Sequence, residues 1–161
     1  MTRRVLVAGV GNIFLGDDGF GAEVARRLAN QQLPDGVKVG DFGIRGVHLA
    51  YELLDGYDLL VLVDTVRRGD PPGTVSTIQV DPEHVSDQPP VGLVDGHGLE
   101  PDAVLSLLRT LGGRLPAVVV VGCEAASTDE GIGLSDPVAA AVEPAVRAVL
   151  DVLGKELKGV G

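Results

Sequence analysis

Two runs of consecutive apolar residues constrain the fold of this chain more than any other feature. They are Leu59–Val63 and Val118–Val121, and both contain several valines. A strand with one face in water alternates apolar and polar residues, whereas an unbroken apolar run is typical of a strand buried on both faces. Strands of that kind occur in parallel sheets that carry helices on both sides. We therefore expect these two runs to lie inside a mostly parallel sheet.

The other segments alternate between strand-like and helix-like patterns. Further strands are predicted at Val5–Gly9, Val37–Phe42 and, as an antiparallel edge strand, Thr74–Val80. Helices are predicted at Ala22–Asn30, Val47–Leu54, Pro101–Leu111 and Pro137–Leu153, followed by a fraying tail at Gly154–Gly161. This order predicts one α/β domain over residues 1–161, a three-layer sandwich of about five strands with helices on both faces.

Charge and composition argue against several classes of protein. The chain has 13 lysines and arginines and 23 aspartates and glutamates, which gives a formal net charge of −10. That balance argues against binding to nucleic acid and suits a site for cations or for a basic segment of a partner. No apolar run approaches the roughly 20 residues of a membrane span, and no cleavage site of small residues follows the first apolar stretch. We expect a cytoplasmic monomer that contacts neither nucleic acid nor membrane.

Acidic residues follow the predicted strands, at the edge where open parallel sheets bind ligands. Asp17 and Asp18 come after the first strand, Asp64 ends the third, and His97 lies in the long stretch before the helix at Pro101. Two carboxylates and an imidazole are a suitable ligand set for a divalent metal ion. Each residue also has a structural interpretation: a helix N-cap for Asp17 or Asp18, a turn residue for Asp64, and an exposed loop histidine for His97.

Two other patterns leave alternatives open. Gly9-x-Gly11 after a strand begins a dinucleotide-binding fingerprint, but position 14 is Phe14 where the third glycine would stand, and the two aspartates nearby would repel a pyrophosphate. Cys123 follows a predicted strand and could serve as a nucleophile with His97. A lone cysteine is more often a small buried hydrophobic residue.

The first loop resembles the signature of a known family. The segment reads Val5-Leu-Val-Ala-Gly-Val-Gly-Asn-Ile-Phe-Leu-Gly-Asp-Asp-Gly-Phe-Gly21. It closely resembles the N-terminal signature of the nickel–iron hydrogenase maturation endopeptidases. The resemblance covers nearly the whole chain, since Leu59–Val66, the segment Asp95-Gly-His97-Gly, and Gly131–Ser135 match later motifs of the family in order and spacing.

The resemblance implies an aspartyl-type endopeptidase that activates a hydrogenase by removing a C-terminal peptide from the nickel-loaded large-subunit precursor. The family's nickel-recognising ligands fall on Asp18, Asp64 and His97, and the two aspartates are also candidate catalytic residues. The nickel would be carried by the substrate, so no permanently bound metal is expected. It would polarise the scissile carbonyl or generate a hydroxide, or else it would hold the peptide while a carboxylate activates a water. A nickel-dependent binding or chaperone module that does not cut, and a nucleotide-binding α/β domain, are the alternatives.

One loop departs from the family's pattern. After the second strand the family usually reads Asp-Gly-Gly-Thr-x-Gly, whereas this chain reads Asp41-Phe-Gly-Ile-Arg-Gly46. The aspartate and two of the glycines persist, and larger side chains stand between them. We expect Asp41, Gly43, Arg45 and Gly46 to help bind the precursor, and the departure bears on which precursor is accepted.

Overall fold

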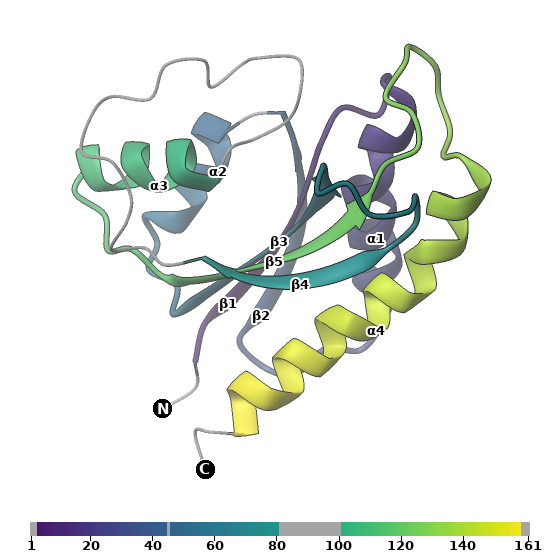
Figure 1. The fold of residues 1–161 in the computed structure, drawn as a ribbon. Coiled ribbons are helices and arrows are strands. Elements are labelled where there is room, and N and C mark those ends of the chain that lie inside the picture. The colour runs from purple at the N-terminus through teal and green to yellow at the C-terminus, as the bar shows by residue number, and fades with distance from the viewer. Residues whose placement is uncertain (1–2, 45, 81–100, 159–161) are drawn as a thin grey trace.

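The computed structural model describes residues 3–44, 46–80 and 101–158, and a five-stranded sheet runs through the middle of this part (Figure 1). The strands are β1 (Val5–Val10), β2 (Val37–Gly43), β3 (Leu59–Val66), β4 (Val75–Val80) and β5 (Ala117–Glu124). Their order across the sheet is β2-β1-β3-β5-β4. All neighbours are parallel except β4, which pairs antiparallel with β5 at one edge. The predicted mostly parallel sheet with an antiparallel edge strand is therefore confirmed.

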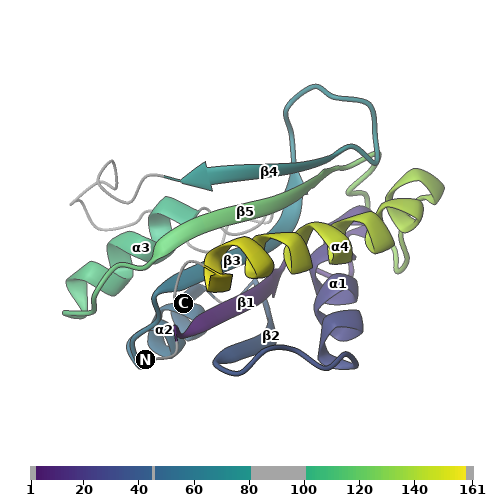
Figure 2. The same cartoon turned by 90° about the horizontal axis from the view of Figure 1, so that it is seen from below.

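Helices cover both faces of the sheet. They are α1 (Phe20–Ala29), α2 (Gly46–Leu53), α3 (Pro101–Thr110) and α4 (Asp136–Lys158), and a short 3₁₀ helix, η1 (Gly16–Gly19), precedes α1. The helices α1 and α4 pack on one face, and α2 and α3 pack on the other (Figures 1 and 2). This arrangement confirms the predicted three-layer fold. Within the described residues, no helix combines the length and the apolar character that crossing a membrane requires.

The strand β3 shows why its sequence is apolar without interruption. The side chains of Leu59, Val61 and Val63 enter the core beneath α1 and α4, and those of Leu60 and Leu62 enter the core beneath α2 and α3. All five are at most 2% exposed. Full burial of such a side chain stabilises the fold by about 1.5–3 kcal/mol relative to exposure. The polar residues of β3 come only after this buried stretch, at the carboxyl edge of the sheet.

The C-terminal helix is longer than its sequence predicts. Fraying was expected from Gly154, but α4 continues to Lys158. Glycine is a poor helix former, so local propensity favours an earlier end. Tertiary contacts override it, because Leu157 packs against the core and Oε2 of Glu156 lies 2.9 Å from Nη1 of Arg3. The ion pair also ties the end of α4 to the residues that lead into β1.

Candidate active site

The carboxyl edge of the sheet holds the two aspartates that the sequence singled out. Asp18 lies in η1, directly after the loop that leaves β1, and is 3% exposed. Asp64 lies within β3, opposite Gly122 of β5, and is partly buried. The interpretation of Asp64 as a turn residue is wrong, because β3 continues to Val66. Two separate segments of the chain thus bring a carboxylate to the same edge.

The loop after β1 folds around Asp18. Gly11 has a φ of +132°, and a Cβ built on it would lie 2.0 Å from the backbone oxygen of Asp18. Only glycine allows this approach. The N–H of Asn12 then donates a hydrogen bond of 2.7 Å to Oδ2 of Asp18. The helix-cap interpretation of Asp17 and Asp18 is wrong, since Gly19 is the N-cap of α1 and makes no side-chain cap bond.

Thr65 connects the two carboxylates. Its hydroxyl donates to Oδ1 of Asp18 over 3.2 Å, and its backbone N–H donates to Oδ1 of Asp64 over 2.7 Å. The structure therefore brings Asp18 and Asp64 together through the residue that follows Asp64 in β3. A hydroxyl at this position was not among the residues that we predicted for the site, and nothing in the sequence marks it as a partner of Asp18.

The third predicted ligand, His97, lies outside the described residues. Among residues 3–44, 46–80 and 101–158, no three histidine, cysteine, aspartate or glutamate side chains gather into a group that could hold a metal ion. Two carboxylates alone are an incomplete ligand set for a nickel or zinc ion, which commonly also takes an imidazole or a thiolate. The set of Asp18, Asp64 and His97 therefore stays a prediction.

Asp17 holds the first loop in place, whereas its neighbour Asp18 is the predicted nickel ligand. The side chain of Asp17 is 1% exposed and accepts four hydrogen bonds. Oδ2 accepts from the N–H of Ala126 at 2.8 Å, the N–H of Ser127 at 2.9 Å and the hydroxyl of Ser135 at 2.9 Å, while Oδ1 accepts from the N–H of Ser135 at 2.6 Å. Burial by itself raises the pKa of Asp17, but these donors outweigh it and hold the pKa below its ordinary value.

A second buried carboxylate, Glu124, organises the connection between β3 and β4. It is 6% exposed at the end of β5, and its Oε1 accepts from the backbone N–H groups of Arg68 and Asp70, both at 2.8 Å. Its own backbone N–H donates to Thr74. From the sequence, an acidic residue at the end of a strand is expected to be exposed to solvent. In the structure, the loop that contains Arg68 and Asp70 covers Glu124.

Cys123 has the environment of a core residue rather than of a nucleophile. Its side chain is fully buried and belongs to the core beneath α1 and α4. Burial, together with the negative charges of Asp17 and Glu124, raises the pKa of the Cys123 thiol to about 11. The thiolate is the reactive form, so almost none is present at neutral pH. The structure thus favours the buried hydrophobic role that we expected over the catalytic one.

The backbone donors of the first loop are occupied, which bears on the nucleotide-binding alternative. The N–H of Gly11 donates to the carbonyl oxygen of Gly43 over 2.8 Å, and the N–H of Asn12 donates to Asp18. A phosphate cradle needs such N–H groups to point at the ligand. Here they hold the protein's own groups, and two carboxylates stand beside them. The geometry therefore argues against a pyrophosphate in this loop.

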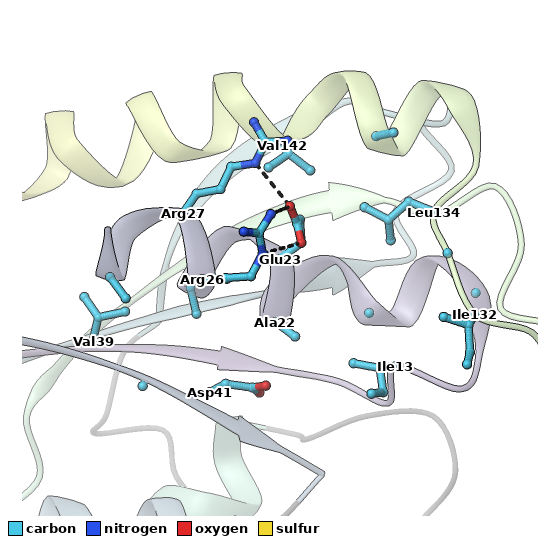
Figure 3. A pocket seen from close by; sticks show the side chains of 17 residues that line it. Ile13, Ala22, Glu23, Arg26, Arg27, Val39, Asp41, Ile132, Leu134 and Val142 are labelled. Carbon is cyan, nitrogen blue, oxygen red and sulfur yellow. Dashed lines mark hydrogen bonds and ion pairs between the residues drawn. The ribbon is translucent and has the colours of Figure 1, made fainter. Parts of the chain in front are cut away.

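A pocket of about 780 Å³ lies beside the first loop and is lined by α1, β2 and the start of α4 with the loop before it (Figure 3). Its lining includes Ile13 and Ile132 at the loops, Ala22, Glu23 and Arg26 on α1, and Val39, Gly40 and Asp41 on β2. Neither Asp18 nor Asp64 lines the pocket, although Gly16 and Gly19, on either side of the adjacent aspartates, do. In Figure 3, Asp41 lies across the pocket from the side chains of α1.

The predicted precursor-binding residues occupy different positions. Asp41 lines the pocket, and its Oδ1 accepts a 2.9 Å hydrogen bond from the N–H of Gly43. Gly43 has a φ of +57°, and its carbonyl oxygen joins it to the first loop. Gly46 is buried at the start of α2, on the other face of the sheet, and Arg45 lies outside the described residues. Their role in binding stays a prediction.

Known proteins are similar to this chain in sequence and in fold. Residues 22–152 match the family model described as hydrogenase maturation protease. This chain belongs to the hydrogenase maturation protease family. The hydrogenase 2 maturation protease of Escherichia coli is 31% identical over 154 residues, which cover 93% of this chain and 90% of that protein. The coenzyme F420 hydrogenase subunit delta of Methanothermobacter thermautotrophicus is 32% identical over 94% of this chain and 95% of its own length.

A solved structure supports the same assignment. The crystal structure of a hydrogenase 2 maturation peptidase from Thaumarchaeota archaeon SCGC_AB-539-E09 superimposes with a TM-score of 0.72 at 35% identity. The superposition covers 94% of this chain and 99% of that one. The resemblance noted in the sequence is confirmed, and so is the α/β fold that it implies. As a member of the hydrogenase maturation protease family, the chain is a peptide-bond hydrolase.

Proposed function

We propose that this protein removes a C-terminal peptide from the nickel-loaded precursor of a hydrogenase large subunit. The observation that carries the proposal is the pair of carboxylates, Asp18 and Asp64, that Thr65 joins at the carboxyl edge of the sheet. Both are positioned by hydrogen bonds before any substrate arrives, which is what metal recognition and water activation require. The family membership adds the reaction class, which is hydrolysis of a peptide bond.

In the proposed reaction the nickel belongs to the substrate. Asp18, Asp64 and His97 complete the coordination of the nickel that the precursor carries, so the protease needs no resident metal. Each oxygen of Asp18 accepts one hydrogen bond from the part of the chain that the structure describes, and a carboxylate oxygen has further lone pairs for a cation. The bound nickel then polarises the scissile carbonyl or supplies a hydroxide, or it fixes the peptide while Asp18 or Asp64 activates a water.

Recognition of the precursor involves the pocket beside the first loop and the segment 41–46. Asp41 lines the pocket, and hydrogen bonds tie Gly43 both to Asp41 and to the loop that carries Asp18. We propose that Asp41, Gly43, Arg45 and Gly46 contact the precursor here. We also propose that the enzyme acts as a monomer in the cytoplasm, where metal insertion into the precursor would precede cleavage.

A second candidate function has one observation in its favour. A relative that is 32% identical is named as a subunit of a hydrogenase rather than as a protease. A nickel-dependent module that binds the precursor without cutting it would use the same two carboxylates as ligands. Cleavage of the precursor distinguishes the two functions directly.

A cleavage assay read by mass spectrometry tests the proposal. Nickel-loaded and nickel-free large-subunit precursor from the same organism are each incubated with wild type, Asp64→Asn and Asp129→Asn. Asp129 is exposed in the loop beside η1, so its variant controls for the loss of one charge near the carboxylates. We expect loss of a C-terminal peptide only from the loaded precursor, with wild type and Asp129→Asn but not with Asp64→Asn. Binding of the loaded precursor without cleavage would support the non-cutting module instead.

A further inference from the structure

Thr65 donates a hydrogen bond to each of the two candidate carboxylates. Its hydroxyl lies 3.2 Å from Oδ1 of Asp18, and its N–H lies 2.7 Å from Oδ1 of Asp64. One hydrogen bond uses the side chain and the other uses the backbone. Two carboxylates from different segments are therefore linked through a single residue.

The surroundings of Thr65 limit how far it can move. Its Cα pairs with that of Cys123 in the parallel ladder between β3 and β5, and Cys123 is fully buried. Threonine branches at Cβ, so its χ1 angle has few accessible rotamers, and in a strand this restricts the direction of the hydroxyl. A fixed backbone and a stiff side chain make Thr65 a rigid donor rather than an adaptable one.

We propose that Thr65 is a positioning residue for the cleavage reaction, which holds Asp18 in the orientation that completes the nickel coordination. This inference rests on the proposed function, because it assigns Thr65 a role only through the two aspartates. Asp64 keeps its bond from the backbone N–H in any Thr65 variant, so the bond that a change of side chain removes is the one to Asp18. The bond to Asp18 is longer than the 2.7–2.8 Å typical of a hydroxyl donor, as is common for active-site hydrogen bonds that tighten only when substrate binds.

Substitutions at position 65 separate the hydroxyl from the shape of the side chain. Thr65→Val keeps the branched shape and the backbone N–H but removes the donor, whereas Thr65→Ser keeps the donor. Thr65→Ala paired with Thr65→Ser repeats the comparison if the valine variant fails to fold. Thr77→Val is the matched control, because Thr77 is an exposed residue of the edge strand β4.

Steady-state cleavage of the nickel-loaded precursor, with folding checked by circular dichroism, provides the readout. A hydrogen bond to a charged group corresponds to a factor of about ten or more in binding. We expect Thr65→Val to raise KM about tenfold while kcat changes less, and Thr65→Ser and Thr77→Val to stay within about twofold of wild type. If Thr65 only filled space, valine, which matches its shape more closely than serine, would be tolerated better. Activity with serine and a raised KM with valine would therefore assign the effect to the hydroxyl.

Two other results would overturn the inference, and only one of them would also overturn the proposed function. In the first, Asp64→Asn abolishes cleavage while Thr65→Val (or Thr65→Ala) cleaves with the KM of wild type. Thr65 then does not position Asp18, and the proposed function still stands. If Asp64→Asn cuts like wild type, the carboxylate pair has no part in cleavage. In that case both the proposed function of the site and the role of Thr65 are wrong.

Discussion

Replacing Asp17 by asparagine keeps the shape of a buried side chain and removes its charge. The amide oxygen can take the place of Oδ2 and keep the bonds from Ala126, Ser127 and the hydroxyl of Ser135. The amide NH₂ must then take the place of Oδ1, where it faces the N–H of Ser135 across 2.6 Å. Two donors would point at each other, so at least this bond is lost.

The bookkeeping of hydrogen bonds gives the size of the effect. The lost bond to a charged acceptor is worth about 1.5–3 kcal/mol. The three retained bonds weaken because a neutral acceptor binds roughly half as strongly as a carboxylate, which adds about 1–2 kcal/mol. Relief from burying a charge offsets part of this, so we expect Asp17→Asn to lower the free energy of unfolding by about 2–3 kcal/mol. For a chain of this size, that corresponds to a fall in Tm of roughly 5–10 °C.

The effect should depend on pH in a defined direction. Hydrogen bonds hold the folded-state pKa of Asp17 below the ordinary value of 3.8, so the unfolded chain binds its proton more readily. The stabilisation by Asp17 is therefore fully present above about pH 4 and is lost as the pH falls through the folded-state pKa. The gap in unfolding free energy between wild type and Asp17→Asn should be widest near pH 7 and shrink in acid.

Urea unfolding followed by circular dichroism at several pH values measures both quantities. Asp129→Asn is the control, because Asp129 is an exposed residue near the segment that Asp17 holds. An Asp17→Asn variant within about 0.5 kcal/mol of wild type would refute the reasoning, since changes of that size are typical of surface substitutions. A gap of constant size from pH 7 to pH 3 would refute the electrostatic part.

Three further predictions concern the rest of the site. Gly11→Ala places a Cβ 2.0 Å from the carbonyl oxygen of Asp18 at a φ of +132°, so cleavage of the loaded precursor should fall at least a hundredfold, measured against the wild-type rate. Cys123→Ala should cleave within about threefold of the wild-type rate, and mass spectrometry should find the native thiol unmodified by iodoacetamide at pH 7, because the pKa of Cys123 is raised to about 11. Rapid alkylation with loss of activity would contradict this. Glu124→Gln should speed limited trypsin cleavage after Arg67 or Arg68, because both backbone N–H bonds end on Oε1 and an amide oxygen accepts more weakly than a carboxylate. An unchanged digestion rate would show that other contacts hold the loop.

Patterns in the sequence predicted the fold and one part of the site. The unbroken apolar runs predicted interior parallel strands because a strand buried on both faces has no place for a polar side chain. The rule that ligands bind at the carboxyl ends of parallel strands led to Asp18 and Asp64, and the structure brings both to that edge. His97 and Arg45 lie outside the described residues, so their part in the site stays predicted.

The residues that the sequence did not reveal depend on contacts between distant segments. Asp17 and Asp18 are adjacent and alike, and what distinguishes them is the segment 126–135, which surrounds Asp17 from more than a hundred positions away. Thr65 looks like an ordinary strand residue until η1 is placed beside β3. Glu124 is buried by a loop that returns over it. Local sequence patterns do not predict the burial or the hydrogen-bond partners of these residues, because both arise only once distant segments have folded together.

The ion pair between Arg3 and Glu156 has a practical consequence for handling the enzyme. It joins the two ends of the described chain at the edge of the sheet where β1 begins, and Figure 2 shows both ends there. The carboxylates lie at the opposite edge, beyond the six residues of β1, or about 20 Å of extended strand. An immobilisation tag or fluorophore attached after Glu156 or before Arg3 would therefore start on the far side from Asp18 and Asp64. A surface-bound enzyme of this kind would keep the edge with the two carboxylates open to a large protein substrate.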